Sequence, residues 1–402
     1  MAENDQEVAV KDLKARATAA IDARAEELGL IAKELHDDPE IAFEEVRSSK
    51  RLADRLVAAG LTTHLPAFGL ETAIASEFGS DNGPTVGIVA EYDALPGLGH
   101  ACGHNVIGTA ALGAALGLAD LGESLPGRVR LLGTPAEEGG GGKILMAEEG
   151  AFEGLDAVMM IHPADRNLAT FPLIARTRIT AIFRGQTAHA AAAPEEGVNA
   201  LDALVSAYVA IGMLRQQVSG DHRIHAVIRE GGEAINVIPD RTVGEFAVRA
   251  PRRSQLESLL AQVENCLRGS ALSAGAEVEI HRDPVEYFDL RGNDALQNAF
   301  RNNAEALGRV FDEIETLPSS LTASTDFGNV SYLCPAIHPM IAMVPRGTPF
   351  HTHAFAMHAG SSEGTRAVLD GAKAMAMTAI DLMCDAHLRA MVADDFKADD
   401  SQ

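Results

Sequence analysis

The sequence predicts an α/β protein of two domains, the second inserted into the first. At 402 residues and 47% hydrophobic content, the chain exceeds the length at which a single core stops growing. Short apolar runs alternate with helical stretches in the first part of the chain and again near its end, a pattern typical of a mostly parallel sheet covered by helices. Between these parts the pattern changes to strand, helix, strand, strand, helix, strand.

The first part opens with two predicted helices. Apolar residues recur at helical spacing in residues 10–35 and 43–60, and the turn-forming string "HDDPE" lies between them. Four apolar runs bounded by Gly, Pro or Asp then predict buried strands. These runs are residues 71–78, 85–97, 127–142 and 157–165. Helical stretches at 106–122 and 143–152 alternate with them, as expected for a parallel sheet.

The inserted domain is predicted from residue 177 onward. Its strands are expected at 177–185, 222–230, 242–250 and 276–282, and its helices at 197–218 and 254–275. This βαββαβ order is the ferredoxin-like arrangement. After Arg291 the first pattern returns, with a helix at 294–307, a buried run at 336–344 and a long final helix. We therefore assign residues 1–176 and 291–402 to the α/β domain and 177–290 to the insertion, and we expect the acidic end, 393–402, to lack regular structure.

Composition argues against nucleic-acid and membrane partners. The formal net charge is −24, from 57 acidic and 33 basic residues, so an anionic polymer or lipid surface would be repelled. The N-terminus is acidic and polar, and no run approaches a transmembrane span, so we expect a cytoplasmic protein. The four cysteines are widely separated, which favours thiols or ligands over disulfides in that compartment.

Metal-binding side chains follow three successive predicted strands. Because the carboxyl ends of parallel strands meet at one edge of a sheet, we expect these side chains to lie together. They are Asp93 late in the second run with Cys102 and His104 after it, Glu137 and Glu138 late in the third run, and His162 late in the fourth. A thiolate, two imidazoles and carboxylates suit zinc, manganese or cobalt better than calcium or magnesium.

The C-terminal half and the paired glutamates extend this site. The string "RGTPFHTHAFAMH" supplies His351, His353 and His358 as further candidate ligands. Two adjacent glutamates after a strand allow one carboxylate to hold metal while the other takes a proton from water. That division of roles predicts a metal-assisted hydrolase.

Two other functions remain open at this point. Cys102 could be a nucleophile with His104 as its base, although Glu138 and His162 would then have no role. The chain could also be a catalytically silent metal-binding or ligand-binding protein, although a structural site is closed and needs no carboxylate base such as Glu137. The string "GSSEG" matches the nucleophile motif of serine hydrolases, but before a long helix it is better interpreted as an N-cap.

Seven motifs together resemble the co-catalytic metallopeptidase and amidohydrolase family of aminoacylases, auxin-conjugate hydrolases and glutamate-releasing carboxypeptidases. The likeness is greatest to the branch of p-aminobenzoyl-glutamate hydrolase and β-alanyl-dipeptide hydrolase. The motifs are "HDDPEIAFEE", "EYDALPG", "GHACGHN", "GTPAEEGGGGK", "HAAAAPEEGVNALDA", "INVIPD" and "STDFGNVSY", and they extend over nearly the whole chain.

The resemblance implies a homodimeric enzyme with two divalent metal ions, zinc or manganese, in the α/β domain and an inserted dimerisation and lid domain. By motif position, the implied metal ligands are Cys102, His104, Glu138, His162 and His351, with His353 as a rival to His351 and the cysteine bridging both ions. Glu137 would be the general base for a metal-activated water, and His189 would reach the partner subunit's site to stabilise the oxyanion.

Three further residues are implied near the metals or the substrate. Asp93 would orient a ligand, and Asn236 would contact substrate. Asn105 stands where much of the family has Asp, a feature of the branch named above. The expected reaction is hydrolysis of the amide bond in N-acyl or N-aminoacyl amino acids, of the aminoacylase, p-aminobenzoyl-glutamate hydrolase or dipeptidase type.

Overall fold

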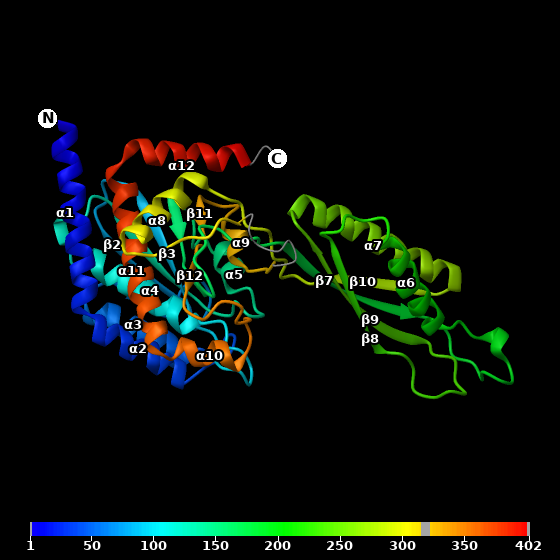
Figure 1. Cartoon of the computed structure of the whole chain (residues 1–402). Coiled ribbons are helices and arrows are strands. Elements are labelled where there is room, and N and C mark those ends of the chain that lie inside the picture. The colour runs from blue at the N-terminus through cyan, green and yellow to red at the C-terminus, as the bar shows by residue number, and fades with distance from the viewer. Residues whose placement is uncertain (1, 315–321, 400–402) are drawn as a thin grey trace. The chain divides into compact units, whose positions relative to one another are not determined.

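The computed structural model describes residues 2–314 and 322–399, and these form two compact units (Figure 1). The first unit contains the chain up to Pro172 and most of the chain after Leu290. The second unit contains Leu173–Asp289 together with the short segment Thr322–Gly328. That segment is held to the second unit by the bridge between Ala323 and Leu173 and by a hydrogen bond from Ser324 Oγ to the carbonyl of Ile174.

A largely parallel sheet forms the centre of the first unit. Its strand order is β1-β2-β4-β3-β5-β11, and β3 runs parallel to both β4 and β5. Only the β1 and β2 side of the sheet is antiparallel. The strands are β1 (Thr63–His64), β2 (Ile74–Gly79), β3 (Thr85–Glu91), β4 (Arg128–Thr134), β5 (Ala157–Met159) and β11 (Ala336–Ile337), and β6 (His162–Ala164) pairs separately with β12 (Met340–Ala342).

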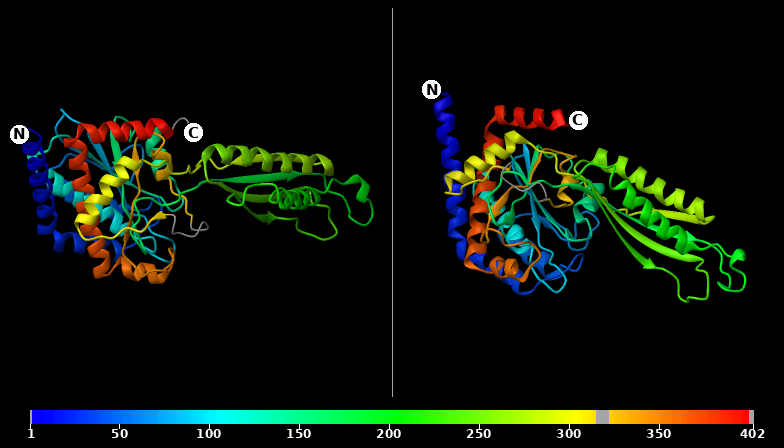
Figure 2. Two further views of the ribbon diagram at one scale, coloured as in Figure 1. Left: turned by 45° about the horizontal axis from the view of Figure 1, so that its top comes forward. Right: turned by 45° about the vertical axis from the view of Figure 1, so that its right-hand side comes forward.

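The helix α4 (His104–Ala119) is buried along almost its whole length, which explains its unusual sequence. It contacts α1, α2, α3 and α11, so it has no polar face and is rich in Ala, Gly and Leu. A Cβ at Gly117 would collide with the side chain of Ile21. The small residues therefore allow neighbouring helices to approach α4 closely. Figure 2 shows α1 beside α11 in both views.

The other helices of the first unit surround this core. They are α1 (Ala2–Ala23), α2 (Ala25–Asp37), α3 (Val46–Ala58), α5 (Gly142–Glu148), α8 (Asp294–Ala306), α10 (His353–Ala359), α11 (Ser362–Cys384) and α12 (Ala386–Asp399), with η1 (Gly122–Ser124) as a 3-10 turn. The short helix α9 (Phe327–Val330) begins in the second unit and ends in the first. The Ser361 side chain accepts hydrogen bonds from Glu363 N and Gly364 N at the start of α11, so "GSSEG" is an N-cap as predicted.

Two expectations about helices are wrong. The helix expected at 10–35 breaks at Arg24, whose guanidinium binds the carbonyl of Ala20 and the carboxylate of Asp120. The break allows both resulting helices to contact α4.

The acidic end is helical through Asp399 rather than irregular. Long-range contacts order it: Arg291 donates to the carbonyl of Phe396, and Asp395 accepts from Ala295 N at the start of α8. No local pattern predicts such contacts.

The second unit has its own sheet and core. Its elements follow in the expected order: β7 (Ala175–Arg184), α6 (Ala200–Leu214), β8 (Arg223–Glu230), β9 (Arg241–Ala250), α7 (Arg253–Ala274) and β10 (Glu277–Arg282), with η2 (Pro194–Glu196) as a 3-10 turn. The sheet is antiparallel with strand order β10-β7-β9-β8. Alternate residues of β7 are buried, and they form one apolar cluster with α6 and α7.

Over the described residues, no helix is long and apolar enough to cross a membrane.

Candidate metal centre

Three neighbouring parallel strands deliver the candidate ligands. β3 lies between β4 and β5 in the sheet, so the carboxyl ends of all three strands meet at one edge. Asp93 and Cys102 lie in the segment between β3 and α4, and His104 is the first residue of α4. Glu137 and Glu138 follow β4, and His162 begins β6 just after β5. The convergence that the sequence predicted is therefore present.

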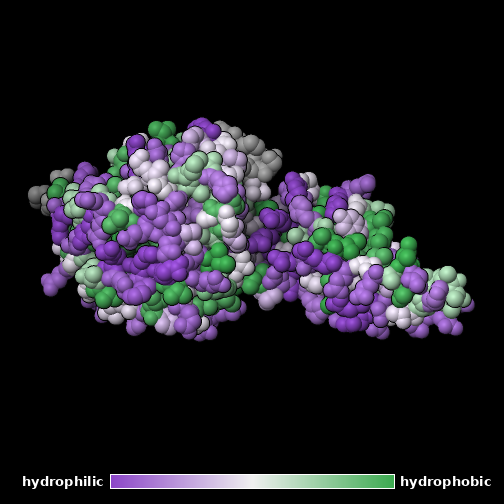
Figure 3. All heavy atoms as spheres, turned by 90° about the horizontal axis from the view of Figure 1, so that it is seen from below, coloured by the Kyte–Doolittle hydropathy of each residue, from purple (hydrophilic) through white to green (hydrophobic). Residues whose placement is uncertain are grey.

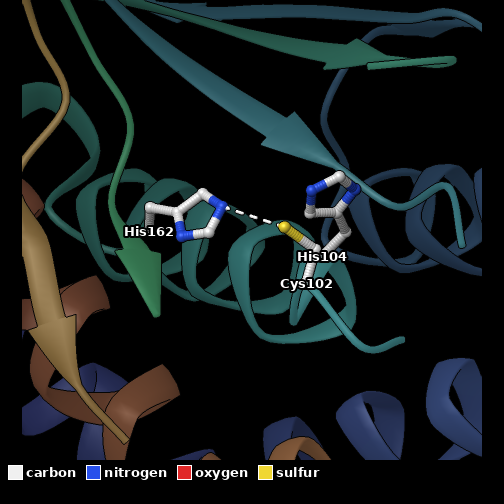
Figure 4. Close-up of side chains that lie close together, drawn as sticks. All are labelled: Cys102, His104 and His162. Carbon is white, nitrogen blue, oxygen red and sulfur yellow. Dashed lines mark hydrogen bonds between the residues drawn. The ribbon is translucent and has the colours of Figure 1, made fainter. Parts of the chain in front are cut away.

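Six of the expected side chains form overlapping groups of potential metal ligands. The ligand atoms within each group lie within 4.8 Å of one another. The groups are Cys102 with His104 and His162, Cys102 with Glu138 and His351, and His104 with Glu137 and Glu138. Figure 4 shows the thiol of Cys102 between the two imidazoles of the first group, with Sγ 3.5 Å from Nε2 of His162. Cys102, His104 and Glu138 each belong to two groups, so the three groups form one connected cluster.

Hydrogen bonds to the far side of both imidazoles determine which nitrogen faces the centre. Nδ1 of His104 lies 2.9 Å from Oδ1 of Asp93, and Nδ1 of His162 lies 2.8 Å from the carbonyl oxygen of Pro163. Both partners are acceptors, so each Nδ1 carries a proton, and Nε2 is the nitrogen that offers a lone pair when the ring is neutral. Asp93 also accepts from the backbone N of Glu138 through Oδ2. One carboxylate thus orients ligands from two different segments.

Two buried atoms support a bound cation. Within the described chain, Nε2 of His104 and Oε1 of Glu138 are buried and make no hydrogen bond. They lie 3.9 Å apart, and their other charged neighbours, Glu91 Oε2 and His351 Nε2, are no closer than 3.4 and 3.5 Å. Leaving such atoms unsatisfied costs about 1–3 kcal/mol each. A divalent ion would satisfy both, and the mixed sulfur, nitrogen and oxygen donors match a borderline-soft metal. The residues present therefore fit a metal centre.

Glu91 and Lys143 add a buried ion pair on the Nε2 side of His104, which the residue patterns did not reveal. Nζ of Lys143 lies 2.6 Å from Oε1 of Glu91, and Oε2 of Glu91 lies 3.4 Å from Nε2 of His104. Burial lowers the pKa of His104, but Asp93 and Glu91 outweigh it and hold that pKa well above its usual value. For His162, burial lowers the pKa to about 4. The only sequence signal for this pair was two charged residues next to apolar runs.

The environment of Cys102 disfavours a thiol nucleophile. Burial, and then the negative charge of Glu138, raise the pKa of the Cys102 thiol well above its usual value. A nucleophilic cysteine needs the opposite shift, because the thiolate is the reactive form.

Among the three C-terminal histidines, only His351 joins the cluster in the described residues. Its Nε2 lies 3.5 Å from Oε1 of Glu138, a contact that raises the pKa of His351. The backbone at His351 has a φ of 59°, and its N donates to the carbonyl of Ala101. His353 instead begins α10, and His358 lies in its last turn. The geometry thus favours His351 over its rival.

His189 and Asn236 both belong to the second unit. The backbone brings them together, since Ala190 N donates to the carbonyl of Asn236. Both residues are exposed. A hollow of about 670 Å³ lies beside them, lined by Thr187 and by residues 229–234 and 237–241. The metal-ligand groups described above belong to the first unit.

Asn105 lies inside the first unit, fully buried at the start of α4. Its Nδ2 donates to the carbonyl oxygens of Ala32 and Ala359, at 3.0 and 2.9 Å. The side chain thus connects α4 with α2 and α10. Both partners are acceptors, which explains why this chain has an amide, with its two donors, at this position.

The substitution Asn105→Asp should therefore destabilise the protein. A carboxylate would face two carbonyl oxygens in a buried site, at a cost of about 2 kcal/mol or more in the free energy of unfolding. Thermal denaturation would measure this, with the exposed α8 residue Asn298→Asp as control. Equal melting temperatures for the two variants would contradict the assigned hydrogen bonds.

Known proteins resemble this chain over most of its length. Residues 87–381 match the family model described as Peptidase family M20/M25/M40. A curated Xaa-Arg dipeptidase of Mus musculus is 41% identical, over 96% of this chain and 92% of its own. A p-aminobenzoyl-glutamate hydrolase chain of Escherichia coli is 29% identical, over 92% of each chain.

A solved structure has the same fold. It is a dinuclear metal binding peptidase from the M20 family of Bacillus subtilis, superposed with a TM-score of 0.72 at 22% sequence identity. The match covers 90% of this chain and 99% of that one.

Proposed function

The chain belongs to peptidase family M20/M25/M40, and we propose that it is a metal-dependent hydrolase of the amide bond in dipeptides and N-acyl amino acids. The observation that carries this proposal is the cluster of Cys102, His104, Glu138 and His162 at the carboxyl ends of three parallel strands, with His351 from the segment before α10 and Glu137 next to it. The named relatives cleave bonds of this kind.

We assign the five clustered residues as ligands of two divalent ions, zinc or manganese. The two groups that share Cys102 together contain all five assigned ligands, which supports a bridging role for its sulfur, and the unsatisfied atoms of His104 and Glu138 support ligation. The Bacillus subtilis neighbour is described as dinuclear, which agrees with this number of ions.

When bound, the ions would polarise the scissile carbonyl and lower the pKa of the attacking water. Glu137 would accept the proton of that water and pass it to the leaving amine. Asp93 would keep Nε2 of His104 directed at the metal by holding the proton on Nδ1.

We further propose that the second unit, as an inserted ferredoxin-like domain, forms a homodimer and supplies His189 of the partner subunit to each site. Nδ1 of His189 accepts from the backbone N of Ala191 and of Ala192, both at 3.2 Å, so the neutral ring carries its proton on Nε2. That proton could be donated to the oxyanion of the transition state, and Asn236 beside it could bind substrate.

The charge of the chain favours a cationic leaving group. With a formal net charge of −24, the protein attracts cationic substrates and repels anionic ones. The mouse relative is named for dipeptides that end in Arg. We therefore expect a higher kcat/KM for dipeptides with a basic C-terminal residue than for p-aminobenzoyl-glutamate or N-acetyl amino acids. Measuring all of these substrates in one panel tests this order.

Metal removal should abolish activity and lower the melting temperature. A ligand that binds only the folded state stabilises it, so the loss should appear in both measurements. Elemental analysis before and after chelation should give two ions per chain and then none, and zinc or manganese should restore turnover. Full turnover in a verified metal-free sample would exclude the proposed mechanism.

The substitution Glu137→Gln should reduce kcat by about a hundredfold to ten-thousandfold, the range for loss of a general base, with the metal retained. The exposed residue Glu123→Gln is the matched control and should behave as wild type. If the wild-type protein binds metal but cleaves no member of the panel, the catalytically silent alternative is favoured instead.

An apolar stripe on α6 supports the proposed dimer. Val205, Tyr208, Val209 and Met213 are 39–61% exposed at helical spacing, and β8, the next element along the chain, is an edge strand of the sheet. Figure 3 shows hydrophobic patches among hydrophilic residues on the second unit.

The substitution Val209→Glu should therefore shift the protein from dimer to monomer, because it would bury a charge in the interface. Light scattering after gel filtration would measure the mass. Leu272→Glu, at an 82% exposed position on α7, is the control and should leave the mass unchanged. A monomeric wild-type protein would contradict the proposed assembly.

A further inference from the structure

Glu45 is a fully buried carboxylate that lies far in sequence from the metal cluster. Its Oε1 accepts hydrogen bonds from the backbone N of Phe43 at 3.0 Å and of Ala136 at 2.9 Å. Its Oε2 accepts from Oγ1 of Thr72 at 3.0 Å. It thus connects the start of α3 with the segment after β4, which contains Glu137.

The two residues whose backbone N–H groups bind Oε1 both have strained backbone conformations. Phe43 has a φ of 63° and Ala136 a φ of 60°, in the left-handed region that residues with a Cβ seldom adopt. Such conformations cost about 1–3 kcal/mol each and persist only where the surroundings hold them. The carboxylate of Glu45 supplies that restraint at both positions.

The segment after β4 is restrained on both sides of Glu137. Glu45 holds N of Ala136, and Asp93 holds N of Glu138 through Oδ2. The ring of Phe43 also packs where a Cβ at Gly140 would lie. A buried carboxylate therefore holds the backbone on each side of Glu137.

We propose that Glu45 is a positioning residue for Glu137: by holding the strained backbone at Ala136, it directs the Glu137 carboxylate to the reacting water. Glu45 is fully buried and belongs to no metal-ligand group found among the described residues. This inference rests on the proposed role of Glu137 as general base.

A glutamine at position 45 should preserve this function. Its amide oxygen can accept both backbone N–H groups, and its NH₂ can donate to the Thr72 hydroxyl. Burial, with a further contribution from the charge of Asp93, raises the pKa of Glu45 to about 7, so a neutral side chain is already present near that pH. Alanine removes the acceptors, and aspartate shortens the side chain by one methylene and cannot reach both segments.

Glu40 provides a matched control in the same part of the chain. It is buried, and its carboxylate accepts from the backbone N of Arg47 and of Ser48 at the start of α3. Over the described residues, its side chain forms hydrogen bonds and ion pairs with Arg47 and Ser48 alone. Loss of Glu40 should therefore reproduce the cost of removing a buried carboxylate beside α3 without releasing Glu137.

The test compares Glu45→Ala, Glu45→Gln, Glu45→Asp, Glu40→Ala and Glu137→Gln in the full-length, metal-loaded enzyme, using the best dipeptide of the panel. For Glu45→Ala we expect kcat to fall about a hundredfold, the cost of a small misplacement of a catalytic group, with KM and metal content unchanged. We expect Glu45→Gln to remain within about threefold of wild type, and Glu40→Ala to lose melting temperature but not kcat.

Several outcomes would overturn the inference. If Glu45→Ala does not fold, the kcat of Glu45→Asp is measured in its place. A wild-type kcat in either variant contradicts a positioning role. Equal losses of kcat and metal in the Glu45 and Glu40 variants would identify a merely structural effect. If Glu137→Gln is inactive while Glu45→Ala is fully active, only the inference fails. If Glu137→Gln turns over at full rate, the proposed function fails and the inference with it.

Discussion

The parallel pairing of β3 with β4 and β5 is the constraint on which the candidate site depends. Parallel strands end at the same edge of a sheet, so three segments separated by tens of residues converge there. The segments after these strands contain Cys102 and His104, Glu138, and His162. No local interaction between these segments would be needed to bring them together, because the sheet register already does so.

Buried carboxylates then set the detailed geometry at this edge. Asp93 binds both His104 and the backbone of Glu138, and Glu45 binds the backbone on the other side of Glu137. Lys143 is the buried cation beside Glu91, but the cluster remains rich in acidic groups. Acidic side chains packed this closely repel one another unless a cation lies among them. A bound metal ion would therefore stabilise this edge of the sheet, because it would offset the repulsion between the acidic groups that surround it.

Residue patterns identified most elements because they record local preferences and burial. The alternation of apolar runs with helices predicted the largely parallel sheet, and the N-cap at Ser361 followed from its place before a long helix. The failures have one cause. The break at Arg24 and the ordering of the acidic end depend on partners far away in sequence, Asp120 and Arg291. Glu91, Lys143 and Glu45 were missed for the same reason, since a buried charge is recognisable only beside its partner.

The sequence by itself determined the α/β class with its largely parallel sheet, the order of elements in the second unit and the side chains that gather at the strand ends, because periodicity and residue type are local properties. Tertiary structure decided which histidine of "FHTHAF" joins the cluster: a left-handed backbone directs His351 to Glu138, while His353 begins a helix. It also decided the role of Asn105, whose amide meets two carbonyl oxygens from distant helices. Such choices depend on the direction of a side chain in space, which only packing between remote segments specifies.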